Sequence, residues 1–217
     1  MRRHLDGRSE SHGDMIDLYS FQHYDDLASS FASGRAYRPS MALARRSKVD
    51  RDHGDSAWWD VFEPAYQWIM MEMDSAVGCR PSSDAAPVWA WARWVDARGR
   101  VRVKPDLRYT GFRGAYPGLD LVHLRVDESR VLLTDFDCFH MVLNDTSCIP
   151  RDLPGDDAGD WLDRHREESE EWKRRNWHDN VIVPHDAMPV AWIQATLWEM
   201  REGDVVDVRR FPRWWRL

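Results

Sequence analysis

The stretch of residues 131–145 constrains the fold most, because it joins a short apolar strand to an amphipathic helix. Residues 131–133 are apolar β-formers that run directly into Thr134. Asp137 follows three residues later, and the pair matches a capping box in which Thr134 caps a helix. The apolar residues around and beyond Asp137 have helical spacing: Phe136, Phe139, Val142 and Leu143. The stretch therefore predicts a strand that feeds a helix beginning near Asp135.

The same stretch offers side chains of the kinds that bind divalent cations, namely Asp135, Asp137, His140 and Asp145. Two interpretations are open. Capping accounts for Thr134, Asp135 and Asp137 without a ligand, because a carboxylate in the first turn complements the helix dipole. A metal site would require the acidic side chains and His140 to converge. We expect capping and no bound metal.

Hydrophobic periodicity along the rest of the chain predicts a mixture of strands and helices. Expected strands cover residues 16–21, 88–95, 101–103, 119–126, 190–199 and 205–208, of which the second and third form a hairpin. Expected helices cover residues 23–32 and 62–77 and part of 156–176, whereas residues 44–56 are expected to form a flexible loop. Because strands and helices do not alternate strictly, we predict an α+β fold whose mixed or antiparallel sheet has about six strands.

Composition limits the domain count, the compartment and the partners. A chain of 217 residues suits a single domain, here residues 15–217, behind a polar leader at residues 1–14 that we expect to be disordered. No apolar run is long enough to span a membrane. The net charge of −7 argues against a protein that coats nucleic acid. Three cysteines without paired spacing favour a reducing cytoplasm over a disulfide framework or a zinc site.

Thirteen tryptophans are the unusual feature of the composition, and they too have two interpretations. Large aromatic side chains can simply fill a core, with their indole N–H groups bonded to backbone carbonyls. Alternatively, a subset can form a stacking cleft for a base or a nicotinamide ring. Trp89 and Trp91 share one face of their predicted strand, so they are the candidates for such a cleft.

Several blocks of the sequence are similar to the signature blocks of the bacterial domain-of-unknown-function family 3841. They are residues 18–22, 65–69, 87–91, 104–108, 132–144 and 193–199. The resemblance covers about residues 16–211 in order, and one departure is Phe139, where the family pattern leads us to expect tryptophan. The family is largely uncharacterised, so the resemblance implies little about activity.

Residues 18–27 also resemble the first strand and helix of ADP-ribosyltransferases of the DNA-modifying toxin kind. In those enzymes an arginine or histidine on the first strand grips NAD, and Ser20 occupies that position here. A catalytic glutamate lies on a late strand, commonly two residues after a glutamine or glutamate. Gln194 matches the earlier residue, Thr196 occupies the later position, and the nearest carboxylate is Glu199. This resemblance implies a shared ADP-ribosyltransferase-like fold more than a shared reaction.

The leading functional hypothesis is a cytoplasmic bacterial transferase with a tryptophan-lined cleft for NAD or another nucleotide-like ligand. Its expected catalytic residues are Glu199, Gln194 and His23, and Glu199 would orient or deprotonate the acceptor. Its expected cofactor-binding residues are Tyr19, Ser20, Gln22, Trp89, Trp91 and Arg108. In this scheme Arg108 or His23 neutralises a phosphate.

The alternative hypothesis is a non-catalytic accessory module of a defence or biosynthetic gene cluster, which binds a ligand or a protein. Convergence of the polar candidates in one pocket would favour the enzyme, and their dispersal would favour the module. The late strand is the main anchor of either hypothesis. Its apolar face is Ile193, Ala195 and Leu197, whereas its mixed face, suited to a ligand, is Trp192, Gln194, Thr196 and Trp198.

Overall fold

An antiparallel sheet of eight strands forms the centre of the computed structural model, which describes residues 13–51 and 57–211. The strands are β1 (Met15–Gln22), β2 (Val88–Val95), β3 (Val101–Arg102), β4 (Asp120–Asp127), β5 (Leu132–Asp135), β6 (Ile182–Val183), β7 (Ile193–Leu197) and β8 (Val205–Arg209). Their order across the sheet is β6-β5-β7-β2-β1-β4-β8, and β3 pairs with β2 as a hairpin. The late strand β7 is therefore central, between β5 and β2.

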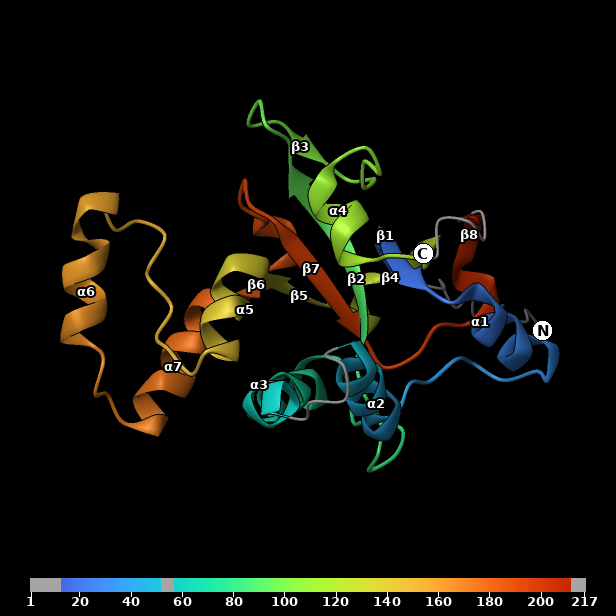
Figure 1. The fold of residues 1–217 in the computed structure, drawn as a ribbon, viewed down its shortest axis with the longest axis horizontal. Coiled ribbons are helices and arrows are strands. Elements are labelled where there is room, and N and C mark those ends of the chain that lie inside the picture. The colour runs from blue at the N-terminus through green and yellow to red at the C-terminus, as the bar shows by residue number, and fades with distance from the viewer. Residues whose placement is uncertain (1–12, 52–56, 212–217) are drawn as a thin grey trace, which may run out of the picture.

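Seven α-helices accompany the sheet in the part of the chain that the structure describes. They are α1 (Tyr24–Ala32), α2 (Met41–Arg51), α3 (Ala57–Ala76), α4 (Thr110–Ala115), α5 (Phe136–Leu143), α6 (Ala158–Arg164) and α7 (Glu170–Val181). In Figure 1, α3, α4 and α5 lie around the central strands β7 and β2, whereas α6 lies at the margin beyond α7.

The two faces of the sheet pack against different helices. On one face, Leu27 and Phe31 of α1 join the inward residues of the strands in a buried aliphatic cluster, which includes Leu18, Ala90, Leu124, Leu133, Ile193, Ala195 and Leu197. On the other face, α3, α5 and α7 contribute Trp68, Phe139 and Trp177 to a second cluster. A third, largely aromatic cluster on that face joins Phe112 of α4 to Tyr19 and Trp91. We call the first the α1 face and the second the aromatic face.

The predicted fold class is confirmed. The fold is a single α+β domain with an open antiparallel sheet, and it has eight strands where about six were expected. The hairpin and the final edge strand lie where the alternation of side chains placed them. The expectation of a disordered leader at residues 1–14 falls almost wholly outside the described residues.

Three helix predictions were wrong in extent. Residues 44–56 were expected to be a loop, but residues up to 51 belong to α2, and residues 52–56 lie outside the described part. Helix α3 begins at Ala57 rather than near Phe62, since buried Trp59 extends its packed face, and Pro64 lies inside it. The expected helix within 156–176 is two helices, because Ser169 caps α7 by accepting a hydrogen bond from the Trp172 backbone N–H at 3.2 Å.

The predicted cap of α5 was also wrong by one residue. Thr134 stays in β5, where it pairs with Ile182 on one side and Gln194 on the other. Asp135 is the N-cap instead, and its Oδ1 accepts a hydrogen bond from the Cys138 backbone N–H at 2.9 Å. The helix begins where expected, but strand pairing fixes the Thr134 backbone and leaves the capping position to the next residue.

Candidate functional site

A row of directly paired residues crosses the aromatic face of the sheet. The cross-strand partners in this row are, in order, Thr134 of β5, Gln194 of β7, Trp91 of β2, Tyr19 of β1 and His123 of β4. Direct partners on antiparallel strands present their side chains to the same face. One row below, Thr196 pairs with Trp89, which places Trp89 on this face as well.

Three polar side chains on this face have no hydrogen-bond partner in the part of the chain that the structure describes. The Nε1 of Trp89 and the Oγ1 of Thr134 are buried without a partner. The Gln194 amide also makes no hydrogen bond, although only 9% of that residue is exposed. Buried polar groups are bonded in the great majority of cases, so the two buried exceptions, Trp89 and Thr134, mark an unusual place beside the unbonded Gln194 amide. We call Trp89, Thr134 and Gln194 the polar patch.

Neighbouring polar groups on the same face do have partners. The Thr196 hydroxyl donates to the Leu132 carbonyl at 3.4 Å, and Trp91 Nε1 donates to the Tyr116 hydroxyl at 3.2 Å. These two neighbours are thus bonded within the protein, unlike the polar patch; a further buried atom without a partner, His185 Nδ1, belongs to a residue outside the patch. The sequence singles out Gln194 and Trp89 but suggests a cap at Thr134, because only the strand register shows that Thr134 stands beside Gln194.

Aromatic rings border the polar patch. The ring centroid of Trp89 lies 5.0 Å from that of Phe139 on α5 and 6.0 Å from that of Tyr66 on α3. Trp91, beside Gln194, lies 5.0 Å from Phe136. These ring partners are all uncharged, and the Trp89 ring is only partly buried. The patch therefore combines flat apolar surface with a few unsatisfied donors and acceptors, which is the composition of a small-molecule site.

Tyr19, expected to bind the cofactor, lies farther along the row. Its ring stacks on His123 with 4.5 Å between centroids, and His123 Nε2 lies 2.9 Å from an Asp17 carboxylate oxygen. Burial raises the pKa of the Tyr19 hydroxyl, and the negative charges of Asp17 and Asp207 raise it further. Tyr19 is therefore a neutral donor at physiological pH.

Ser20 and Gln22 lie apart from the polar patch. They alternate with Tyr19 along β1, so they face the opposite side of the sheet. There they satisfy each other, since Gln22 Nε2 donates to Ser20 Oγ at 3.0 Å and Ser20 Oγ donates to the Trp89 carbonyl at 2.7 Å. The Ser20 hydroxyl and the Gln22 amide nitrogen are thus engaged within the protein.

The expected charged residues also lie elsewhere. The Glu199 carboxylate accepts hydrogen bonds from Arg38 and Arg201. Arg108 is paired with Asp106, and its side chain is 92% exposed. His23 is exposed at the start of α1, and its side chain makes no capping bond. The structure thus gathers Tyr19, Trp89, Trp91 and Gln194 on one face, but not Ser20, Gln22, His23, Arg108 or Glu199.

Asp135 and His140 of the candidate metal ligands have structural partners. Asp135 caps the helix and accepts a hydrogen bond from Arg151 Nη2 at 2.8 Å, while His140 Nδ1 lies 2.8 Å from the Phe136 carbonyl oxygen. Partial burial raises the pKa of Asp137, and the neighbouring Asp135 charge acts in the same direction. Among the described residues, no group of three or more histidine, cysteine or acidic side chains is placed to hold a metal ion.

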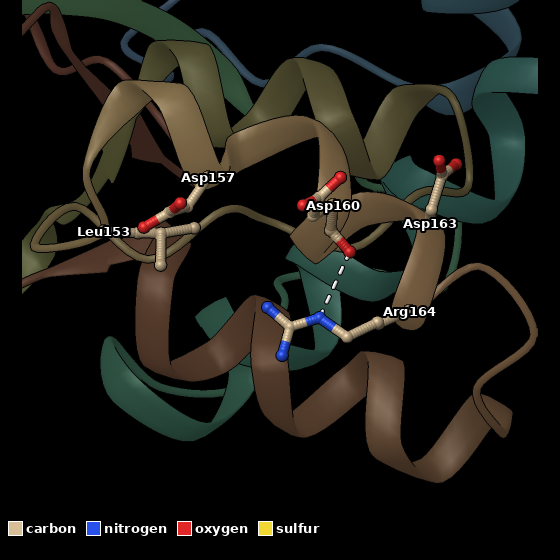
Figure 2. A pocket seen from close by; sticks show the side chains of 5 residues that line it. All are labelled: Leu153, Asp157, Asp160, Asp163 and Arg164. Carbon is tan, nitrogen blue, oxygen red and sulfur yellow. Dashed lines mark hydrogen bonds between the residues drawn. The ribbon is translucent and has the colours of Figure 1, made fainter.

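A pocket of about 430 Å³ lies at α6 (Figure 2), the helix at the margin of the fold in Figure 1. It is lined by Leu153, Asp157, Asp160, Asp163 and Arg164, and Arg164 Nε donates to the Asp160 carbonyl at 3.2 Å. It contains none of the predicted site residues and no aromatic ring. Its carboxylates are those of a solvated helix face, so the polar patch remains the candidate site.

Comparison with known proteins places the chain in a family. The sequence profile of a family described as a domain of unknown function, DUF3841, matches residues 17–158. The chain belongs to this family. The DUF3841 match includes Trp89 and Thr134 of the polar patch and ends before β7, which carries Gln194. No curated protein and no solved structure matches the chain, so the likeness to ADP-ribosyltransferases stays a prediction. None of the helices in the described ranges is long and apolar enough to cross a membrane.

Proposed function

We propose that this DUF3841 protein is a non-catalytic binding module for a small nucleotide-like ligand, whose flat, uncharged ring lies on the polar patch. The observation that carries the proposal is the pair of buried, unbonded polar atoms, Trp89 Nε1 and Thr134 Oγ1, with the unbonded amide of Gln194 paired beside Thr134. A buried polar group without a partner costs about 1–3 kcal/mol, and a ligand that supplies the partner recovers that free energy.

The chemistry of the polar patch restricts the ring that would fit. Trp89 Nε1 can only donate, whereas the Thr134 hydroxyl and the Gln194 amide can both donate and accept. A ring with adjacent donor and acceptor atoms, such as a nucleobase or a nicotinamide carboxamide, offers complementary groups. The bordering rings of Phe139 and Tyr66 carry no charge that would compensate an ionised group, so we infer an uncharged ring.

The same geometry leads us to prefer binding over transfer chemistry. A transferase would need a carboxylate near the ring, and the Glu199 carboxylate is engaged by two arginines. The proposal retains the bacterial cytoplasm as the setting, which the three unpaired cysteines support. An accessory role in a defence or biosynthetic cluster remains part of the proposal.

The test is calorimetric titration with NAD, nicotinamide, adenosine and uridine, accompanied by mass spectrometry of each mixture. We expect at least one of these to bind, without release of nicotinamide from NAD. Gln194→Ala should weaken that binding about tenfold, the effect of one lost hydrogen bond. Gln67→Ala is the matched control, because Gln67 is an exposed amide on α3.

Two results would count against the proposal. Turnover of NAD by the wild type, abolished in Glu199→Gln, would replace the binding module with the transferase. Unchanged affinity in Gln194→Ala, with melting temperature also unchanged, would place the ligand elsewhere on the protein.

A further inference from the structure

A second cluster of polar side chains lies where β7 ends, and it does not depend on the proposed ring site. The segments around Tyr37 and Met200 are joined there by an isolated β-bridge, with two backbone hydrogen bonds of 2.8 and 3.0 Å. Met200 is fully buried. The backbone on which Arg38, Glu199 and Arg201 stand is therefore held in place.

One carboxylate orients two guanidinium groups in this cluster. Glu199 Oε2 accepts from Arg38 Nε and Nη2 at 2.8 and 2.6 Å, and Oε1 accepts from Arg201 Nε at 2.7 Å. Within the described residues, Arg38 Nη1 and both Nη atoms of Arg201 make no hydrogen bond. The arginine side chains are 55% and 58% exposed, whereas that of Glu199 is only 14% exposed. The free N–H groups therefore lie on the solvent side of the cluster.

A third arginine keeps the cluster positive. Arg130 pairs with Asp204 through two hydrogen bonds of 2.7 and 2.9 Å, and its Nη2 also reaches the Glu199 carbonyl at 3.4 Å. Asp204 in turn accepts from the Arg201 backbone N–H at 2.8 Å. Among these five side chains, three arginines contact two carboxylates, which leaves one positive charge in excess. That charge resides on the two exposed guanidinium groups.

We propose that Arg38 and Arg201 together bind the phosphate group of a small anionic ligand. Guanidinium groups present planar N–H donors that match phosphate oxygens, and a shared carboxylate reduces the side-chain freedom lost on binding. The three free N–H-bearing atoms of the pair would bond phosphate oxygens while Glu199 keeps its present contacts. The cluster is thus an anion site that sequence spacing, which assigned phosphate to Arg108 or His23, does not indicate.

The test uses inorganic phosphate and pyrophosphate, titrated into the full chain at constant ionic strength and followed by two-dimensional NMR. We expect saturable shifts of the amide signals around residues 38 and 201, with pyrophosphate binding more tightly than phosphate. Arg201→Ala and Arg38→Ala should each weaken binding about tenfold or more. Arg108→Ala is the matched control, since Arg108 is an exposed arginine paired with a local carboxylate.

Arg201→Lys guards against misfolding as the cause of any loss, because it keeps the charge and removes the planar fork. Its binding should be intermediate, with an unchanged melting temperature. Non-saturable shifts in the wild type, or equal loss in Arg108→Ala and Arg201→Ala, would show only general attraction of anions to surface arginines and overturn the proposal. Because phosphate and pyrophosphate contain no ring, a negative result with them does not count against the ring site at the polar patch. Likewise, a negative result at the polar patch does not count against the phosphate site.

Discussion

The two faces of strand β7 differ in how completely their side chains are satisfied. On the α1 face, Ile193, Ala195 and Leu197 are all apolar and essentially inaccessible, and they pack under Leu27 and Phe31. On the aromatic face, the same strand presents Gln194, whose amide has no partner among the described residues, beside the unbonded hydroxyl of Thr134. Strand β7 thus packs apolar side chains into a core on one side, whereas on the other side it borders polar side chains that lack hydrogen-bond partners.

This difference separates stability from function along a single strand. Side chains on the α1 face gain their free energy from burial alone, so removing atoms there should reduce stability and leave ligand contacts intact. The unbonded polar atoms Trp89 Nε1 and Thr134 Oγ1 do not add to stability, because they lost water on folding and gained no hydrogen bond. Selection for stability alone would favour apolar side chains there, which is why we assign the patch to a ligand.

The largest effect should come from the α1 face. Ile193→Ala removes a fully buried side chain and leaves a cavity, so the free energy of unfolding should fall by about 2–5 kcal/mol. Urea denaturation followed by circular dichroism measures this change. Val206→Ala is the control, because Val206 is 55% exposed on β8 and should change stability by less than about 0.5 kcal/mol. Similar losses in both variants would break the comparison.

The polar patch should respond in the opposite direction. Thr134→Val replaces an unbonded buried hydroxyl with a methyl group, so the free energy of unfolding should rise by about 1 kcal/mol without ligand. Thr196→Val removes a hydroxyl that donates to the Leu132 carbonyl, and it should lower stability by about the same amount. If Thr134→Val were as destabilising as Thr196→Val, the Thr134 hydroxyl would have a structural partner and the patch would lose one of its three members.

The sequence predicts the strand alternation well, because the side-chain period of two does not depend on neighbouring strands. The alternation alone separates Ile193, Ala195 and Leu197 from Gln194, and the buried cluster under α1 confirms that separation. Sequence-based prediction fails where tertiary context decides. Helix α2 is polar, so its sequence resembles that of a loop. Thr134 was expected to cap α5, but Asp135 is the cap because Thr134 is paired with β7 as part of β5.

The candidate site was harder to predict than the fold, because sites depend on register and on ion pairs that sequence spacing does not contain. Tyr19 and Ser20 are adjacent in sequence, and the expected site included both, yet they face opposite sides of the sheet. Glu199 was expected to be catalytic because of its carboxylate, but that carboxylate is paired with nearby Arg201 and with Arg38, whose proximity only the β-bridge reveals. The sequence predicts which residues of one strand share a face, but it does not predict which residues of other strands lie beside them.

The smallest expected effect is a pH dependence of the free energy of unfolding. It arises from Glu199, which follows the end of β7 and belongs to neither face of that strand. Burial alone would raise the pKa of Glu199, but hydrogen bonds from Arg201 and Arg38 outweigh it and hold that pKa below its ordinary value of 4.5. A carboxyl with a lowered pKa in the folded state adds stability above pH 4.5, and that stability is lost as the pH falls through the folded-state pKa.

Between pH 7 and pH 3 the wild type should therefore lose more stability than Glu199→Gln. The difference should stay below about 1 kcal/mol, because both arginines are exposed to solvent. Urea denaturation of both proteins at several pH values measures it. A larger acid loss in Glu199→Gln than in the wild type would mean that the carboxylate is not stabilised by the two arginines, and the oriented pair proposed to bind phosphate would then lack its anchor.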